Sequence, residues 1–160
     1  MAFLPNAAAL IFVTLISLTH NSFSATDIHD LLPQYNLPKG ILPTNIKSYS
    51  LSDTDGSFTV ELSAHPCYVK FDGQTVYFDR IIKGKLSYGK VSGVSGIQAN
   101  KFFIWVSVSG IDVNENNGMI DFHVGALSQE LPAKDFETIK TCKSKGLEED
   151  STFSFLEALI

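Results

Sequence analysis

The sequence lacks the residue patterns that build the common catalytic and metal sites. Its two cysteines and four histidines are scattered over 160 residues, without the spacing of a zinc site. Residues 93–96 are one residue short of a Gly-x-Ser-x-Gly nucleophile motif. Residues 112–116 begin like a calcium loop, but His123 stands where a bidentate Glu is required. These absences leave no catalytic residue, metal ligand or cofactor to assign, and they favour a protein that is not an enzyme.

The sequence is also poor in positive charge. Lys and Arg number 12 against 17 Asp and Glu, and the net charge at pH 7 is −5. A nucleic-acid-binding domain normally carries a basic excess, and no RNA-binding or zinc-finger signature is present either. We therefore expect no nucleic acid as a partner.

The basic residues that do occur gather in one stretch. Residues 70–101 contain six basic and two acidic side chains, a local net charge of +4. A basic region on an acidic protein suggests an anionic partner, and Lys83, Lys85 and Lys90 are our candidates for binding an anionic lipid or an amphiphilic small molecule. The alternative is that these lysines only protect strand edges from pairing with other chains.

Charged side chains are absent from the first 24 residues. Residues 7–18 form a nearly unbroken apolar run, too short for a membrane span of about 20 residues. Small Ser22 and Ser24 follow at the positions that a signal peptidase reads. We predict a signal peptide over residues 1–24, with an uncleaved anchor or a buried first helix as alternatives. The mature chain would then have no transmembrane segment and would reach the secretory pathway, with the apoplast as its destination.

Only two cysteines are present, Cys67 and Cys142. In the oxidising compartment that a signal peptide implies, they have one intramolecular pairing available. We predict this disulfide, and the alternative is two separate buried thiols.

Hydrophobic residues of both strand faces meet in residues 101–108, which hold the only Trp of the chain. Phe102, Ile104 and Val106 fall on one face of an extended strand, while Phe103 and Trp105 fall on the other. A strand that is apolar on both faces is typically covered on both sides. We therefore predict a central strand here, with Trp105 buried.

Turn residues divide most of the remaining chain into short strands. Asp55-Gly56, Asp72-Gly73 and Asn117-Gly118 are typical hairpin turns. We expect a strand over residues 86–91 and a flexible loop over residues 92–96. Residues 26–35 resemble an amphipathic helix, and residues 132–138 one helical turn.

These elements predict a mainly β fold with one domain over residues 25–145 and a tail over residues 146–160. The domain is expected to be a single antiparallel β-barrel or a strongly curled sheet, because such a sheet must hide its edges and its apolar face. A short N-terminal helix and a short C-terminal helical segment complete it.

The order and spacing of many weak motifs resemble a plant family, domain of unknown function 538. The matching residues run from the N-terminal helix to Cys142 and include Leu37-Pro38, Gly40 to Pro43, Tyr49, Leu51, Gly56, Phe58, Cys67, Tyr77, Gly84, Leu86, Gly89, Gly96-Ile97, Phe103, Trp105, Val108, Ile111, Phe122, Val124-Gly125 and Phe136-Glu137. The chain departs from the family pattern in having Ile at position 41 and an extended tail.

The resemblance implies a small secreted plant protein with a β-barrel-like fold. The family is compared with the lipid-binding bactericidal/permeability-increasing proteins, and a chlorophyll-binding or chlorophyll-hydrolysing role has been proposed for it. It supplies no catalytic residue to carry over. We therefore expect a monomeric, non-enzymatic module that binds a lipid-like or other amphiphilic ligand. The alternatives are an ester hydrolase acting on chlorophyll or a related pigment, and a cell-wall protein-interaction or inhibitor domain.

Overall fold

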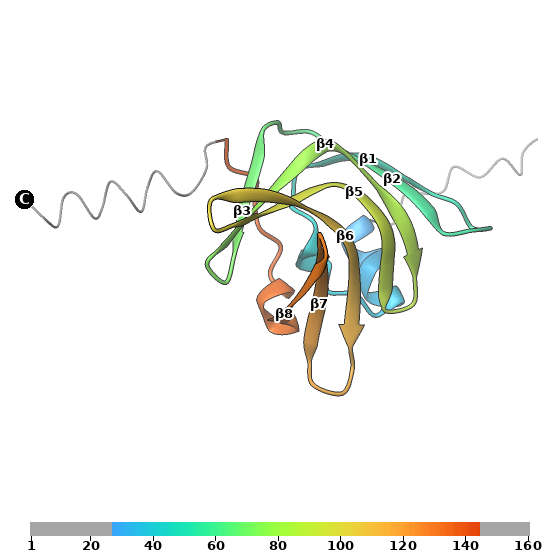
Figure 1. Cartoon of the computed structure of the whole chain (residues 1–160). Coiled ribbons are helices and arrows are strands. Elements are labelled where there is room, and N and C mark those ends of the chain that lie inside the picture. Colours follow the sequence, from blue (N-terminus) through green and yellow to red (C-terminus); the bar gives the residue numbers. More distant parts are fainter. Residues whose placement is uncertain (1–26, 145–160) are drawn as a thin grey trace, which may run out of the picture.

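A computed structural model describes residues 27–144 as one antiparallel sheet that curls around short helical turns (Figure 1). The predicted signal peptide and the predicted tail lie outside these described residues. The strands are β1 (Ile46–Leu51), β2 (Ser57–Leu62), β3 (Cys67–Phe71), β4 (Gln74–Ser87), β5 (Lys90–Lys101), β6 (Ile104–Asn114), β7 (Met119–Val124) and β8 (Leu127–Pro132). Their order across the sheet is β1-β2-β4-β5-β6-β7-β8, and β3 pairs with the first part of β4.

The sheet curls without closing into a barrel. β1 and β8 stand at its two ends, and no pairing joins them within residues 27–144. Curling depends on the long β4, which pairs with β3 through residues 74–78 and with β2 through residues 81–85. Of the two predicted architectures, the structure therefore has the curled sheet.

β5 bends where the sequence suggested a flexible loop. Residues 92–96 lie inside β5, and Gly93 and Gly96 have φ values of 56° and 94°. A Cβ atom on Gly96 would lie 2.4 Å from the carbonyl oxygen of Ile81, so glycine lets β5 cross β4 closely. The expected strand over residues 86–91 is also wrong, because Tyr88 and Gly89 form the turn between β4 and β5.

The predicted central strand over residues 101–108 is wrong in its first half. Phe102 and Phe103 form a two-residue turn between β5 and β6, with φ values of 50° and 68° and exposed fractions of 91% and 90%. Trp105 is 40% exposed, so the prediction that it is buried is wrong too. The prediction failed because Phe-Phe is typical of a strand, whereas a turn with two positive φ values usually contains Asn-Gly.

The concave, inner face of the sheet carries the core, and the N-terminal segment covers it (Figure 1). This segment contains α2 (Ile28–Leu31), η2 (Leu32–Tyr35) and η3 (Lys39–Ile41), and we call residues 28–42 the N-terminal cover. Asp27 caps α2 through a 3.0 Å hydrogen bond that its Oδ1 accepts from the backbone N–H of His29. The predicted N-terminal helix is thus present, although it is one α-helical turn followed by 3-10 turns.

The predicted C-terminal helical turn is η4 (Ala133–Phe136), and it packs against η3. A Cβ atom on Gly40 would lie 2.2 Å from the carbonyl oxygen of Phe136, so the contact requires glycine. Residues 138–143, which we call the C-terminal strap, then return to β3. Cys142 and Cys67 form a disulfide there, with an S–S distance of 2.04 Å.

Candidate functional site

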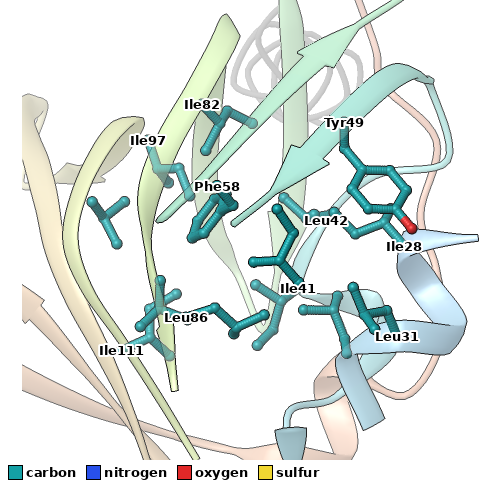
Figure 2. Close-up of a pocket in the computed structure, with 14 residues that line it drawn as sticks. Ile28, Leu31, Ile41, Leu42, Tyr49, Phe58, Ile82, Leu86, Ile97 and Ile111 are labelled. Atoms are coloured by element: carbon teal, nitrogen blue, oxygen red, sulfur yellow. The ribbon is translucent and has the colours of Figure 1, made fainter. Parts of the chain in front are cut away.

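The inner face of the sheet encloses an apolar cavity with two lobes. Lobe 1 lies between the N-terminal cover and the part of the sheet formed by the end of β4, the start of β5 and the end of β6 (Figure 2). All fourteen residues that line it are apolar except Tyr49. Ile28, Ile41 and Leu42 come from the cover and its end, whereas Phe58, Ile82 and Leu86 come from the sheet.

Lobe 2 continues the cavity toward η4. Phe71, Phe78, Phe122 and Phe136 are among its lining residues. Its polar lining groups are the side-chain amides of Gln74 and Gln129. Gln129 Nε2 donates a hydrogen bond to Gln74 Oε1 at 3.5 Å.

Three isoleucines line both lobes and form their shared wall. Ile97 and Ile111 belong to β5 and β6, whereas Ile41 belongs to the cover. Because Ile41 reaches the wall from the side opposite the sheet, the position of the cover decides whether the cavity is divided.

The cavity is small. Each lobe has a volume of about 40 Å³, whereas ligand pockets for drug-sized molecules measure roughly 300–1,000 Å³. An apolar lining gives water no hydrogen-bond partners. In this structure the lobes are therefore apolar voids too small for a drug-sized ligand.

Polar groups at the start of the cover lie beside lobe 1. Burial raises the pKa of the Tyr49 phenol, and the charge of nearby Asp27 raises it further. The pKa of Asp27 is lowered, chiefly by the hydrogen bond from the backbone N–H of His29. Figure 2 shows the Tyr49 hydroxyl directed away from the centre of the lobe. The apolar cavity thus has a polar border on the side of α2.

His29 fastens the start of the cover to its end. The side chain is buried, with Nδ1 2.9 Å from Asp27 Oδ1 and Nε2 2.9 Å from the carbonyl oxygen of Pro43. A carboxylate and a carbonyl both accept, so the ring makes both hydrogen bonds only when both of its nitrogens carry a proton.

The candidate lysines lie on the other, outer face of the sheet. Lys83 and Lys85 are exposed and alternate along β4 with Ile82 and Leu86, which line lobe 1. Lys90 faces the same side, opposite Ser87, and its Nζ is 4.0 Å from Asp112 Oδ1. The structure thus puts the three lysines on one face of the sheet, but it does not place them at the apolar cavity.

The same face carries a row of polar side chains that the sequence analysis missed. The Asp112 carboxylate bonds to His123 Nε2, and His123 Nδ1 is 3.0 Å from Ser128 Oγ. The three residues come from β6, β7 and β8, so no short motif contains them. Only the register of the hairpins could have revealed this row from the sequence. That register pairs His123 with Ser128 and puts Asp112 on the strand next to His123.

Residues 27–144 contain neither a metal-binding cluster nor a membrane-spanning helix. No group of three or more His, Cys, Asp or Glu side chains in this range is arranged to hold a metal ion. Within the same residues, no helix has the length and hydropathy needed to cross a membrane.

Comparison with known proteins identifies the family. The family model described as "Protein of unknown function, DUF538" matches residues 28–137. The chain belongs to this family. A similar protein is "Uncharacterized protein At5g01610" of Arabidopsis thaliana, which is 34% identical over 86 residues, or 53% of this chain and 49% of the relative. The chain therefore spans about half the length of the curated relative it matches, and no solved structure matches it.

The resemblance drawn from the sequence is thus confirmed. The DUF538 match takes in the N-terminal cover, all eight strands and η4, and with them both lobes of the cavity. Cys142 and the rest of the strap lie beyond the matched residues. The cavity is therefore built wholly from the part of the chain that the DUF538 family defines.

Proposed function

We propose that this protein is a non-enzymatic binding module that takes the apolar part of a lipid-like or other amphiphilic ligand into the inner-face cavity. The observation that supports it best is the pair of apolar lobes separated by Ile41 of the cover. Two neighbouring apolar voids that share a wall of three isoleucines are more than folding requires, since well-packed interiors keep few voids larger than a water molecule.

Binding requires the cover to lift, because the closed lobes are too small for a ligand. Few polar contacts hold the cover to the sheet. Gly89 N donates to the carbonyl oxygen of Tyr35 at 2.6 Å, and Asn36 Nδ2 donates to Glu115 Oε1 at 2.6 Å. The remaining contacts are apolar side chains such as Ile28 and Leu32. A ligand with an apolar chain replaces those contacts with its own, so opening exposes little apolar surface to water.

A chain-binding assay tests the proposal. Displacement of cis-parinaric acid by unlabelled fatty acids is measured for the wild type, for Val94→Phe, which fills lobe 1, and for the matched control Ile81→Phe on the outer face. We expect binding by the wild type and the control, and about tenfold weaker binding by Val94→Phe. Ile41→Ala, which opens the partition, is expected to bind more tightly.

Equal binding by all four proteins, or no binding by the wild type, contradicts the proposal. Thermal melting of each variant shows whether a loss of binding comes from a loss of folding. Mass spectrometry of lipids and pigments extracted from the natively purified protein then identifies the ligand.

The site of action belongs to the same proposal. We place the mature module in the secretory pathway and then in the apoplast, on the strength of the uncharged apolar leader and the paired cysteines. Intact mass of protein from plant secretory fractions is expected to give a chain that begins near Ala25 and holds a Cys67–Cys142 disulfide. Retention of residues 1–24, or two free thiols, contradicts this placement.

A second candidate function, ester hydrolysis of chlorophyll or a related pigment, rests on the Asp112–His123–Ser128 row. In that mechanism His123 Nδ1 takes the proton of Ser128 while the hydroxyl oxygen attacks the ester carbonyl, and Asp112 orients the ring. The C–O bond to the alcohol then breaks, His123 gives its proton to the leaving alcohol, and a water molecule releases the acid from Ser128 by the same route. Hydrolysis of a chlorophyll ester that is abolished by Ser128→Ala, with an unchanged melting temperature, supports this candidate. Equal rates for the two proteins remove it. The row lies on the face opposite the cavity, which is why we rank it second.

A further inference from the structure

The two most exposed large hydrophobic residues of residues 27–144 are neighbours in one hairpin turn, and two further exposed hydrophobic residues follow them. Phe102 and Phe103 form the β5–β6 turn and are 91% and 90% exposed, and Ile104 and Trp105 follow with 65% and 40%. We call these four residues the aromatic tip. Large apolar side chains so exposed and so close together normally mark a surface that meets another apolar phase.

The backbone of the turn does not call for these side chains. Both phenylalanines have positive φ values, a conformation for which Asn and Gly are preferred. The neighbouring β3–β4 hairpin follows that preference, with Asp72 and Gly73 at its two turn positions. Two aromatic residues held in an unfavourable conformation at full exposure indicate a function other than folding.

A group of aromatic rings with polar edges lies directly behind the tip on the outer face. The Trp105 ring is 6.0 Å from that of Tyr68 and 6.3 Å from that of Tyr77, and the two tyrosine rings are 5.2 Å apart. The Tyr77 hydroxyl donates to Asp79. Trp and Tyr prefer the boundary between the apolar and polar layers of a bilayer, because one end of each ring is apolar and the other is wet.

Lysines occur on the elements next to this aromatic group. Lys101 ends β5 next to the turn, and Lys70 lies two residues from Tyr68 on the same face of β3. Lys143 pairs with Tyr68 through the backbone, and Lys140 Nζ donates to the carbonyl oxygen of Lys70 at 2.6 Å. The acidic residues of β3, β4 and the turn between them are Asp72, in the turn, and Asp79, on β4. The protein as a whole has a charge of −5, so this end is a local basic region.

We propose that the aromatic tip docks the protein on an anionic lipid bilayer. Phe102 and Phe103 enter the boundary of the acyl chains, Trp105, Tyr68 and Tyr77 lie at the level of the headgroups, and the lysines face the lipid phosphates. A bilayer suits this surface better than a protein pocket does, because an apolar tip ringed by Trp, Tyr and Lys matches the layered polarity of a membrane surface. Figure 1 shows the β5–β6 turn beside β3, away from the N-terminal cover.

The inference goes beyond the proposed function and does not rest on it. The tip and its aromatic neighbours lie on the outer face and at one end of the sheet, whereas the cavity lies on the inner face. Docking and chain binding are therefore separable by substitution.

The test is co-sedimentation of the mature protein with vesicles. Vesicles of phosphatidylcholine alone and of phosphatidylcholine with phosphatidylserine are compared at low and high salt. The tip variant is Phe102→Asn/Phe103→Gly, which suits the turn, and the matched control is Tyr88→Ser, a 71% exposed aromatic residue at the β4–β5 turn. Lys70→Glu/Lys143→Glu tests the charge, and Lys83→Glu/Lys85→Glu/Lys90→Glu tests the lysines at a distance from the tip.

We expect the wild type and Tyr88→Ser to bind anionic vesicles, with salt weakening the binding. The tip variant is expected to bind at least about tenfold more weakly, since two phenylalanine side chains no longer leave water. Lys70→Glu/Lys143→Glu weakens binding more than the triple variant does. Trp105 fluorescence shifts to shorter wavelength on binding of the wild type.

Three results overturn the proposal: no binding of the wild type to anionic vesicles, undiminished binding by the tip variant, or a wild-type dimer in solution that the tip variant loses. The last result makes a second copy of the chain the occupant of the surface. Two further measurements separate this proposal from the cavity proposal. The tip variant is expected to bind fatty acids like the wild type, and Val94→Phe is expected to bind vesicles like the wild type.

Discussion

Phenylalanine side chains are buried in one region of this protein and almost fully exposed in another. Phe78 on the inner face and Phe136 of η4, which packs against that face, are 2% and 3% exposed, whereas Phe102 and Phe103 at the β5–β6 turn are about 90% exposed. Phe78 and Phe136 are buried because the sheet on one side and η4 with the N-terminal cover on the other enclose them in one core. The exposed pair has no such cover within residues 27–144. The comparison teaches that a Phe in this chain is a core residue only where a second layer reaches it.

The largest effect is expected from the inner face. Phe78→Ala is expected to lower the free energy of unfolding by about 3–5 kcal/mol, because it leaves a cavity where the side chain is fully buried. Phe103→Ala, the same change at the tip, is expected to alter it by less than about 0.5 kcal/mol. Chemical denaturation of the two variants measures both values, and equal losses would abolish the distinction between the faces.

Trp105 stands between these extremes. Trp105→Ala is expected to cost about 1–2 kcal/mol, since it removes ring contacts with Tyr68 and Tyr77 but little buried surface. In the wild type, acrylamide is expected to quench the Trp fluorescence readily. An emission spectrum resistant to quenching, or a loss near 4 kcal/mol, would mean that a cover over the outer face exists after all.

The turn offers a gain in stability. Phe102→Asn/Phe103→Gly is expected to raise the free energy of unfolding by about 1 kcal/mol, because the new residues adopt positive φ with less strain. Thermal melting compares it with Tyr88→Ser, which changes an exposed aromatic without changing a positive φ. If the tip variant is less stable than the wild type, the phenylalanines contribute to the fold itself.

The smallest effect concerns the cap of α2. The hydrogen bond from His29 N–H keeps the pKa of Asp27 below its ordinary value of 3.8. Its contribution is therefore complete above about pH 4 and is lost as the pH falls through the lowered pKa. Because the side chain is 62% exposed, the gain is small. Asp27→Asn is expected to flatten this part of the stability profile, which chemical denaturation measures between about pH 2 and pH 6. Identical acid profiles for the wild type and Asp27→Asn would contradict the assignment.

Turn chemistry explains which strands the sequence predicted. Asp72-Gly73 and Asn117-Gly118 were recognised as hairpins because their residues tolerate the positive φ that such turns need. The turn at Phe102-Phe103 was missed because its two residues are apolar and continue the apolar run of residues 102–106. Tyr88-Gly89 was missed because Leu86 and Val91, both buried, flank it like residues of one strand.

The site was less accessible to sequence reasoning than the strands were. The alternation of side chains along a strand places Lys83 and Lys85 on the same face, but it does not say which face of the sheet the N-terminal cover packs against. The cavity wall joins Ile41, Ile97 and Ile111, which lie on η3, β5 and β6, and only the curl of the sheet brings them together. The same holds for the polar row on the outer face, which depends on the register of two hairpins.

The C-terminal strap decides how a mechanical pull would pass through the molecule. Its Lys140 carbonyl accepts from Thr44 N at 2.9 Å, its Cys142 N donates to Asn45 at 2.9 Å, and its disulfide reaches β3. β3 to β8 and η4 therefore lie within one covalent loop from Cys67 to Cys142, whereas β1, β2 and the cover lie outside it. Force applied to Lys143 passes through the S–S bond to Cys67 and bypasses η4 and β8. When the chain is pulled between Lys143 and the N-terminal cover, the force runs through the disulfide and then along residues 28–67. We expect β1 and β2 to separate from the sheet first, while the strands inside the Cys67–Cys142 loop stay paired.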